Sequence, residues 1–374
     1  MSQEARRIYA ELGATPVINV IGNRTFLGGS APSPQVVAAM EAAGRYYVDM
    51  DELLTSSGEI VAQWLECEAA LVTPGCAAAL VLGTAGLMTG KDPAKMEQLP
   101  DSTGMKDEIV MQKRQRYKYD RVVRMVGSRI VEAGRAEGTS AEELEAALGP
   151  DTAAVLYPVV DEGEGLLGVQ EVIEIAHRHS IPVLVDAAYK VYPLEGLKQY
   201  AAWGADLVGY GAKYFGAPNS SGLLCGRADL VEAARLHSFA SFEVNELMGF
   251  GRPLKIDRQE VAGVLAALRE WLDMDHEAAR AQASRRGEVV RAAIADLPHV
   301  EVSPAEGSAA SLHVTLDETG LGKSAAQVDQ ELKADDPRIW VWYDSGPSLQ
   351  LSFATVVDGD EAIVAQRLRA VLGG

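Results

Sequence analysis

The chain has 374 residues, enough for one large and one smaller domain with separate hydrophobic cores. Hydrophobic residues make up 48% of it, no apolar run reaches membrane-spanning length, and the charged N-terminus lacks a signal-peptide core, so we expect a cytoplasmic protein without membrane contact. The formal net charge of −19 would repel a phosphate backbone, which argues against nucleic-acid binding.

Strands alternate with helices between residues 66 and 237. Strands are expected at residues 66–73, 109–111, 122–126, 153–158, 181–185, 205–209 and 221–226. Helices are expected at residues 76–88, 169–179, 197–203 and 228–237, with a further short helix that opens on a capping box at 140–143. This alternation predicts an α/β fold in which a mostly parallel sheet is covered on both faces, with ligands bound outside the carboxyl ends of the strands.

The pattern changes near residue 250, so we expect an N-terminal arm over residues 1–45, a large domain over 46–250 and a small α+β domain over 251–374. For the small domain we expect one long helix at 258–297, strands near 299–302, 310–316, 339–343 and 348–353, and helices near 324–333 and 358–372. The longest irregular stretch is residues 91–106, and a loop of this length could cover a site.

A lysine and an aspartate follow neighbouring strands of the predicted sheet. Asp186 ends an apolar strand, where a carboxylate is costly unless it is paired, and Lys213 stands between glycines just after the next strand. This pair suits a pyridoxal phosphate (PLP) site, with the lysine as Schiff-base nucleophile and the acid on the pyridinium nitrogen. A surface lysine in a glycine-rich turn and a helix-capping or surface acid are the alternatives.

A second candidate element is the run Thr73-Pro74-Gly75-Cys76-Ala77-Ala78, where a strand leads through a glycine into a helix of small residues. The first amide groups of such a helix favour an anion, and a cofactor phosphate fits there. Cys76 at this position could instead be a catalytic thiol, because thiol pKa values fall at helix N-termini. The basic stretch at residues 113–118 faces either a phosphate or an acidic substrate, or is a solvated loop.

Neither the cysteines nor the histidines show a metal-binding pattern. Cys67, Cys76 and Cys225 lack both metal-ligand spacing and a disulfide framework, and we expect reduced thiols. His177 and His179 are two apart on a predicted helix, so they point to different faces. We expect no metal.

The motifs together resemble the fold-type I PLP enzymes, and within them the selenocysteine synthase-like group, which includes bacterial selenium transferases and D-glucosaminate-6-phosphate ammonia-lyase. The resemblance covers nearly the whole chain. It rests on the ordered motifs at residues 16–22, 74–79, 100–105, 185–188, 211–216, 248–253 and 260–268. It implies a large PLP-binding domain with a mostly parallel sheet, a smaller C-terminal domain, and at least a homodimer.

The resemblance also implies a role for individual residues. Lys213 would be the Schiff-base lysine and Asp186 the pyridinium partner. The phosphate would be held by Gly75, Cys76 and Ala77. Ala188 would pack against the ring face, and Arg252 would lie near the substrate.

Several positions depart from the family pattern. Gln115, a further candidate for cofactor binding, occupies the place where ammonia-lyase relatives often carry a ring-stacking histidine. Tyr210 and Ala212 replace serines that often precede the lysine. Gln350 stands where many fold-type I enzymes bind the substrate carboxylate through an arginine. Carboxylate recognition would then come from elsewhere, with Arg24 and Arg252 as candidates.

The resulting hypothesis is a PLP-dependent lyase, of the β-elimination or ammonia-lyase type, acting on an amino acid or amino sugar acid. Aldol cleavage and racemisation begin in the same way, so a PLP-dependent aldolase or racemase is an alternative. A selenium or sulfur transferase acting on aminoacyl-tRNA is another, which the acidic charge and the lack of an evident RNA-binding N-terminal domain disfavour. A PLP-fold binding protein without catalysis is the alternative from a different class.

Overall fold

The computed structural model describes residues 3–245, 247–305 and 308–373, and the chain divides into two compact units, Pro32–Leu272 and Met1–Ala31 with Asp273–Gly374. Each unit has its own hydrophobic core. The division lies at 31/32 and 272/273, whereas the sequence suggested 45/46 and 250/251. Helices α2 (Pro34–Gly44) and α11 (Arg258–Asp273) belong to the larger unit because they contribute apolar side chains to its core.

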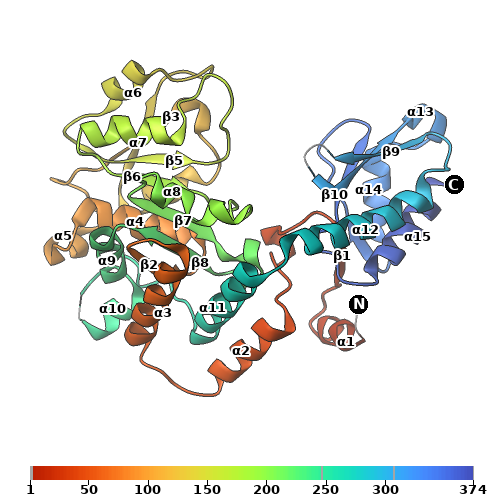
Figure 1. The fold of residues 1–374 in the computed structure, drawn as a ribbon, viewed down its shortest axis with the longest axis horizontal. Helices are drawn as coiled ribbons and strands as arrows, with labels where there is room; N and C mark the ends of the chain where they lie inside the picture. The colour runs from red at the N-terminus through yellow and green to blue at the C-terminus, as the bar shows by residue number, and fades with distance from the viewer. Residues whose placement is uncertain (1–2, 246, 306–307, 374) are drawn as a thin grey trace. The chain divides into compact units, whose positions relative to one another are not determined.

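A seven-stranded sheet forms the centre of the larger unit (Figure 1). Its strands, in spatial order, are β2 (Ala69–Thr73), β8 (Gly222–Gly226), β7 (Leu207–Gly211), β6 (Val183–Asp186), β5 (Thr152–Pro158), β3 (Glu108–Gln112) and β4 (Arg129–Ala133). The strands from β7 to β4 are all parallel, and β8 is antiparallel to both of its neighbours. The predicted mostly parallel sheet is therefore confirmed.

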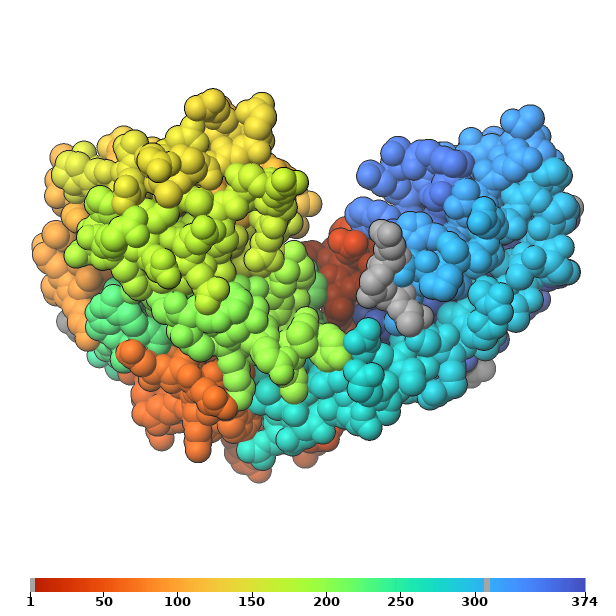
Figure 2. Space-filling view, turned by 45° about the horizontal axis from the view of Figure 1, so that its top comes forward, coloured from red at the N-terminus to blue at the C-terminus, as the bar shows by residue number. Residues whose placement is uncertain are grey.

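Helices pack on this sheet. Helix α4 (Cys76–Thr89) contacts β5 to β8, and its small residues allow this closeness, since a Cβ at Gly83 would touch leucines of three strands. Side chains alternate along a strand, so every second residue of these strands faces away from α4. Tyr210 on β7 is an example: its hydroxyl donates to the carbonyl of Gly196 in η4 (Leu194–Leu197) on the other face of the sheet. The segments around residues 130–200, yellow to green, form a continuous surface of this unit (Figure 2).

Four further helices of the larger unit match the sequence expectations: α6 (Ala141–Ala147), α7 (Val169–Arg178), α8 (Gln199–Ala202) and α9 (Ala228–Leu236). Three others were not expected from the sequence: α3 (Met50–Leu65), α5 (Pro93–Gln98) and α10 (Phe239–Val244). The capping box at the start of α6 is present, with Ser140 and Glu143 bonded reciprocally.

Two expectations for this unit are wrong. Residues 122–126 are not a strand but part of the 3₁₀ helix η3 (Asp120–Val126), because their buried valines, Val123 and Val126, are three apart. Residues 91–106 do not cover the carboxyl ends of the strands. They contain α5, and Ser102 hydrogen-bonds Asp107 and Gly127, which precede β3 and β4 at the opposite edge of the sheet.

The smaller unit is the expected α+β module. Its antiparallel sheet has the order β12 (Ser348–Ser352), β10 (Ser308–Leu316), β9 (Val300–Ala305), and β1 (Val17–Asn19) pairs in parallel with β11 (Arg338–Trp340). Its helices are α1 (Gln3–Glu11), η1 (Thr25–Leu27), α12 (His276–Ile294), α13 (Glu318–Leu321), α14 (Ala325–Ala334) and α15 (Asp360–Leu372). Pairing of β1 with β11 places the N-terminal segment in this unit.

The long helix expected at 258–297 is two helices, α11 and α12. Asp275 interrupts it, because its side chain accepts the backbone N–H of Ala278 and so caps a new helix. The break lies at the boundary between the two compact units. Within the described residues, no helix is both long and apolar enough to cross a membrane.

Candidate active site

Asp186 is the centre of the candidate site. It is the last residue of β6, only 6% exposed, and lies at the carboxyl edge of the sheet. No helix begins until η4 at Leu194, so Asp186 does not cap a helix. Instead its Oδ1 accepts the N–H of Ala188 at 3.1 Å in a tight turn. The side chain therefore faces the region where ligands bind in parallel sheets.

Two further side chains donate to this carboxylate. The Cys76 thiol lies 3.4 Å from Oδ1, and the Tyr117 hydroxyl donates to Oδ2. Asp186 is thus a buried acid that accepts hydrogen bonds from three neutral donors, the Ala188 N–H, the Cys76 thiol and the Tyr117 hydroxyl.

Burial dominates the electrostatics of these three groups. It raises the pKa of Asp186, although hydrogen bonds from Tyr117, Ala188 and Cys76 act in the opposite direction. Burial and the adjacent carboxylate raise the pKa of the Tyr117 hydroxyl and of the Cys76 thiol. Cys76 is therefore a protonated thiol in the ligand-free chain, which disfavours its interpretation as a catalytic thiolate despite its place at a helix start.

Lys213 lies in η5 (Ala212–Phe215), directly after β7, the strand beside β6. The Gly211 N–H donates to the Ala188 carbonyl at 2.9 Å, which ties the backbone before Lys213 to the backbone after Asp186. The Lys213 ammonium lies 5.0 Å from the centroid of the Tyr214 ring, and its charge acts on the Cys76 thiol. The structure thus brings Lys213, Cys76 and Asp186 to one edge of the sheet.

The start of α4 forms one wall of this site. Gly75 is the N-cap at φ 90°, a conformation that favours glycine, and it has no side chain to bond the first helical N–H groups. A Cβ at Gly222 would lie 2.5 Å from the carbonyl carbon of Gly75, so only a glycine there lets β8 approach this turn. Next to it, the buried Oδ1 of Asn219 has no hydrogen-bond partner among the described residues. Ala77, in the first turn, is exposed.

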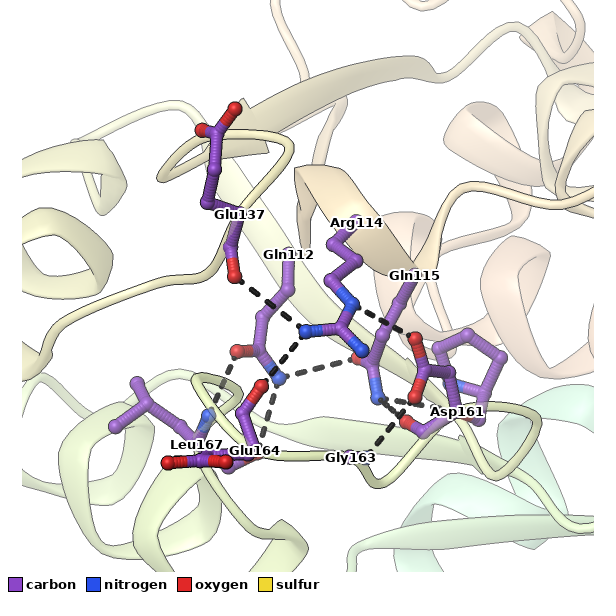
Figure 3. A network of polar contacts seen from close by, with 9 residues as sticks. Gln112, Arg114, Gln115, Glu137, Asp161, Gly163, Glu164 and Leu167 are labelled. Carbon is purple, nitrogen blue, oxygen red and sulfur yellow. Dashed lines mark hydrogen bonds and ion pairs between the residues drawn. The ribbon is translucent and has the colours of Figure 1, made fainter.

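Gln115 is buried in a polar network close to the end of β3 (Figure 3). Its amide nitrogen donates to the carbonyl of Asp161 at 2.9 Å, and its oxygen accepts from Gln112 at 3.1 Å. Arg114 donates to the Asp161 carboxylate and to the Glu164 carbonyl. These contacts hold the loop that follows β5.

Tyr117, two residues after Gln115, provides a contact to Asp186. The sequence reading did not single out this tyrosine; the available signal was an aromatic residue within the basic stretch 113–118. The basic side chains of that stretch are largely paired with acids of the same unit, for example Arg116 with Asp120 and Glu132. The solvated-loop interpretation therefore describes them better than a phosphate site.

The two candidate substrate arginines lie in different units. In the larger unit, Arg252 is ion-paired with Glu243 at 2.6 Å. In the smaller unit, Arg24 stacks on the Trp342 ring at 4.2 Å and has no acidic partner among the described residues. Arg24 and Gln350 line the same cavity of about 310 Å³, so an arginine from the N-terminal segment enters the cavity beside Gln350.

The residues at this edge of the larger unit fit PLP. In the described ranges, histidine, cysteine, aspartate and glutamate form no group of three that could hold a metal ion. A buried carboxylate matches a protonated ring nitrogen, and the uncapped start of α4 matches a phosphate. Lys213 follows the strand next to that of Asp186, where it can act as the amine nucleophile.

Comparison with known proteins agrees with this geometry. The sequence model of the aminotransferase class-V family matches residues 104–331. A 5'-C-glycyluridine monooxygenase-decarboxylase of Streptomyces is 31% identical over 347 residues, covering 89% of this chain and 83% of the relative. D-Glucosaminate-6-phosphate ammonia lyase of Salmonella typhimurium is 29% identical over 373 residues, covering 97% of both chains. L-Seryl-tRNA(Sec) selenium transferase of Moorella thermoacetica is 28% identical and is covered over 60% of its length.

Solved structures give the same result. The structure of a D-glucosaminate-6-phosphate ammonia-lyase matches with a TM-score of 0.86 at 28% identity, covering 98% of both chains. Serine palmitoyltransferase of Sphingomonas wittichii matches with a TM-score of 0.58 at 16% identity, covering 95% of this chain and 87% of the other, and shares the fold alone. The expected fold-type I architecture is therefore confirmed.

Proposed function

The chain belongs to the aminotransferase class-V family, and we propose that it is a PLP-dependent lyase of the ammonia-lyase type. It is an enzyme, and its cofactor is PLP. The similarity to a solved ammonia-lyase over almost the whole chain carries the proposal. The substrate class that this relative suggests is a small amino acid or amino sugar acid.

We assign the roles from the contacts of the ligand-free chain. Lys213 is the amine that attaches the cofactor, and Asp186 holds the protonated ring nitrogen through a charge-assisted hydrogen bond. The phosphate would be held by Gly75, Cys76 and Ala77 at the start of α4. Ala188, half-buried between Asp186 and the strand that leads to Lys213, would lie beside the ring.

The chemistry follows from these positions. PLP supplies an electron-withdrawing ring that stabilises negative charge on the carbon next to the substrate amine. The Lys213 amine would attach the cofactor and, when free, would serve as the general base that removes the proton from that carbon. Arg24, which has no acidic partner in the described part of the chain and lines a cavity with Gln350, is our candidate for binding the substrate carboxylate, with Arg252 as the alternative.

The first test is the absorbance spectrum of the purified protein with added PLP, beside Lys213→Ala and Asp186→Asn. We expect a yellow band in the wild type that borohydride removes, no lysine adduct in Lys213→Ala, and weakened cofactor binding in Asp186→Asn. Substrates are then screened by ammonia release. The absence of any band in the wild type at saturating PLP would refute the assignment of the site.

Three other reactions compete with ammonia release. The Streptomyces relative has slightly higher sequence identity, so an oxidative decarboxylation of a glycyl-bearing nucleoside is the second candidate. An oxygen electrode separates the two, because the lyase consumes no oxygen and the alternative does. Aldolase or racemase activity would instead yield an aldehyde or the opposite enantiomer without ammonia.

We also propose that the enzyme is a cytoplasmic homodimer. Tyr46 and Tyr47, between α2 and α3, are 77% and 97% exposed. This exposure is high for neighbouring aromatic side chains and suggests that a partner covers them. A second copy of the chain would bury them. Light scattering after size-exclusion chromatography that gives a monomer at working concentration would contradict the dimer, and cell fractionation tests the location.

A further inference from the structure

Asp186 is held by different groups at its two oxygens. Oδ1 accepts the N–H of Ala188 at 3.1 Å and the thiol of Cys76 at 3.4 Å, and Oδ2 accepts the hydroxyl of Tyr117. Donors on both oxygens fix the plane of the carboxyl group, because rotation about its last bond would break both sets. Tyr117 is the only one of these donors that does not come from the Asp186 turn or from the start of α4.

The chain positions Tyr117 by its own local contacts. Its backbone N–H donates to the buried carboxylate of Asp120 at 3.2 Å, and Arg116 donates to the same oxygen at 2.5 Å. Its ring packs edge-on against Tyr119, with centroids 5.9 Å apart. Tyr117 follows β3 and Asp186 ends β6, and β5 lies between these strands, so the side chain reaches across one strand to make its bond.

We propose that Tyr117 is a positioning residue that acts through Asp186. Its hydroxyl orients the Asp186 carboxyl group and keeps it ionised for the ring nitrogen of the cofactor. This inference rests on the proposed PLP site. A carboxylate oxygen can accept more than one hydrogen bond, so Tyr117 and a ring cation can share Asp186.

Burial and hydrogen-bond donation shift the pKa of Asp186 in opposite directions. Burial favours the neutral acid, and the Tyr117 hydroxyl favours the carboxylate, so its removal raises the pKa of Asp186 further. A neutral acid cannot form a charge-assisted bond with a cationic ring. The other titratable groups around Asp186 and Tyr117 include Cys76 on α4, Asp120 on η3 and Lys213 on η5, together with Tyr119 and Arg116 on the segment of Tyr117 itself.

The test measures the dissociation constant of PLP from the holoenzyme between pH 5.5 and 8.5, by the absorbance of the bound cofactor. In Tyr117→Phe we expect the loss of affinity on the acid side to begin at higher pH than in the wild type. At pH 6 the dissociation constant should rise roughly 10- to 150-fold, the effect of losing one hydrogen bond to a charged group. Tyr119→Phe is the matched control and should follow the wild type.

A second substitution keeps the test independent of folding defects. Incorporating 2,3-difluorotyrosine at position 117 keeps the ring and the hydroxyl but makes the hydroxyl a stronger donor, so the acid limb should move to lower pH. Identical pH profiles for the wild type and both Tyr117 substitutions would overturn the positioning role. A wild type that binds no PLP would refute the proposed function itself, which is a distinguishable result.

Discussion

The thiol of Cys76 lies 3.4 Å from Oδ1 of Asp186, and this contact makes Cys76 the opposite of a reactive helix-terminal cysteine. Burial and the carboxylate raise its pKa. Cys67 behaves differently, because hydrogen bonding from Cys225 lowers the pKa of Cys67 and raises that of Cys225. Cys67 also lines a cavity of about 710 Å³, whereas Cys225 is buried. The three thiols should therefore differ strongly in reactivity.

Cys67 should be alkylated first. The native protein is treated with limiting iodoacetamide at pH 8, and the modified residue is identified by mass spectrometry at several times. We expect Cys67 to react at least tenfold faster than Cys76 or Cys225, because the thiolate is the nucleophile. In urea the three rates should converge. Faster modification of Cys76 in the native protein would contradict the electrostatic effect of Asp186.

Gly222→Ala should disrupt the wall of the site. The added Cβ would lie 2.5 Å from the carbonyl carbon of Gly75 and 2.6 Å from the nitrogen of Cys76, and neither backbone atom can move without shifting α4. We expect a loss of about 2–3 kcal/mol in the free energy of unfolding, measured by urea denaturation, together with weaker PLP binding. Gly149→Ala is the control, since the nearest atom to its Cβ would be 3.9 Å away. Equal stability of the two variants would refute the argument.

The parts of the fold that the sequence predicted are those with local signals. Apolar runs predicted the strands of the parallel sheet. Because Asp186 and Lys213 each follow the carboxyl end of one of these strands, the sequence also predicted that they lie at the same edge of the sheet. Tyr117 escaped prediction because its bond to Asp186 joins positions 69 residues apart across an intervening strand. No periodicity marks such a contact, and the same holds for the Arg24 stack on Trp342.

Helix breaks and 3₁₀ turns were the other failures. The break before α12 depends on a single aspartate whose cap competes with continuous helical periodicity on both sides. In η3, valines that fit a strand by composition form a 3₁₀ helix instead. This short helix ends at Gly127, whose φ of 92° turns the chain towards β4. Both are decided by a few hydrogen bonds, which composition does not reveal.

His237 should make the protein less stable in mild acid. It is fully buried between the Thr89 hydroxyl, 2.8 Å from Nε2, and the Phe250 N–H, which donates to Nδ1. Burial lowers its pKa from 6.5 to about 4. Since the folded state resists protonation, the stability is complete above pH 6.5 and is lost as the pH falls towards 4, by about 3 kcal/mol.

Urea denaturation of the wild type at pH 7.5, 6, 5 and 4 measures this slope. His237→Gln should be less stable at pH 7.5 but should show a smaller decline in acid. The matched control is the surface variant His179→Gln, which should keep the wild-type decline. A His237→Gln variant whose stability falls with pH as steeply as that of the wild type would show that other groups cause the acid sensitivity.

Gln115→Leu should destabilise the chain before any cofactor is added. The leucine has a similar size, but it leaves the Asp161 carbonyl and one Gln112 donor bond without the partner that the buried amide supplies. We expect a loss of about 1–3 kcal/mol in the free energy of unfolding of the PLP-free protein, and faster proteolysis within residues 159–167. The exposed Gln170→Leu on α7 is the control and should change neither quantity.

The same variant separates a structural from a cofactor-binding role for Gln115. If its amide serves the network of Figure 3, the loss of stability is the same with and without saturating PLP, because the broken bonds are equally absent in both states. If Gln115 instead contacts the cofactor, the loss is confined to the loaded protein, where the bound ligand adds to the stability of the folded state. Thermal unfolding of both forms, with Tyr117→Phe measured alongside, distinguishes these outcomes, and a loss confined to the loaded Gln115→Leu protein would return this residue to the cofactor site.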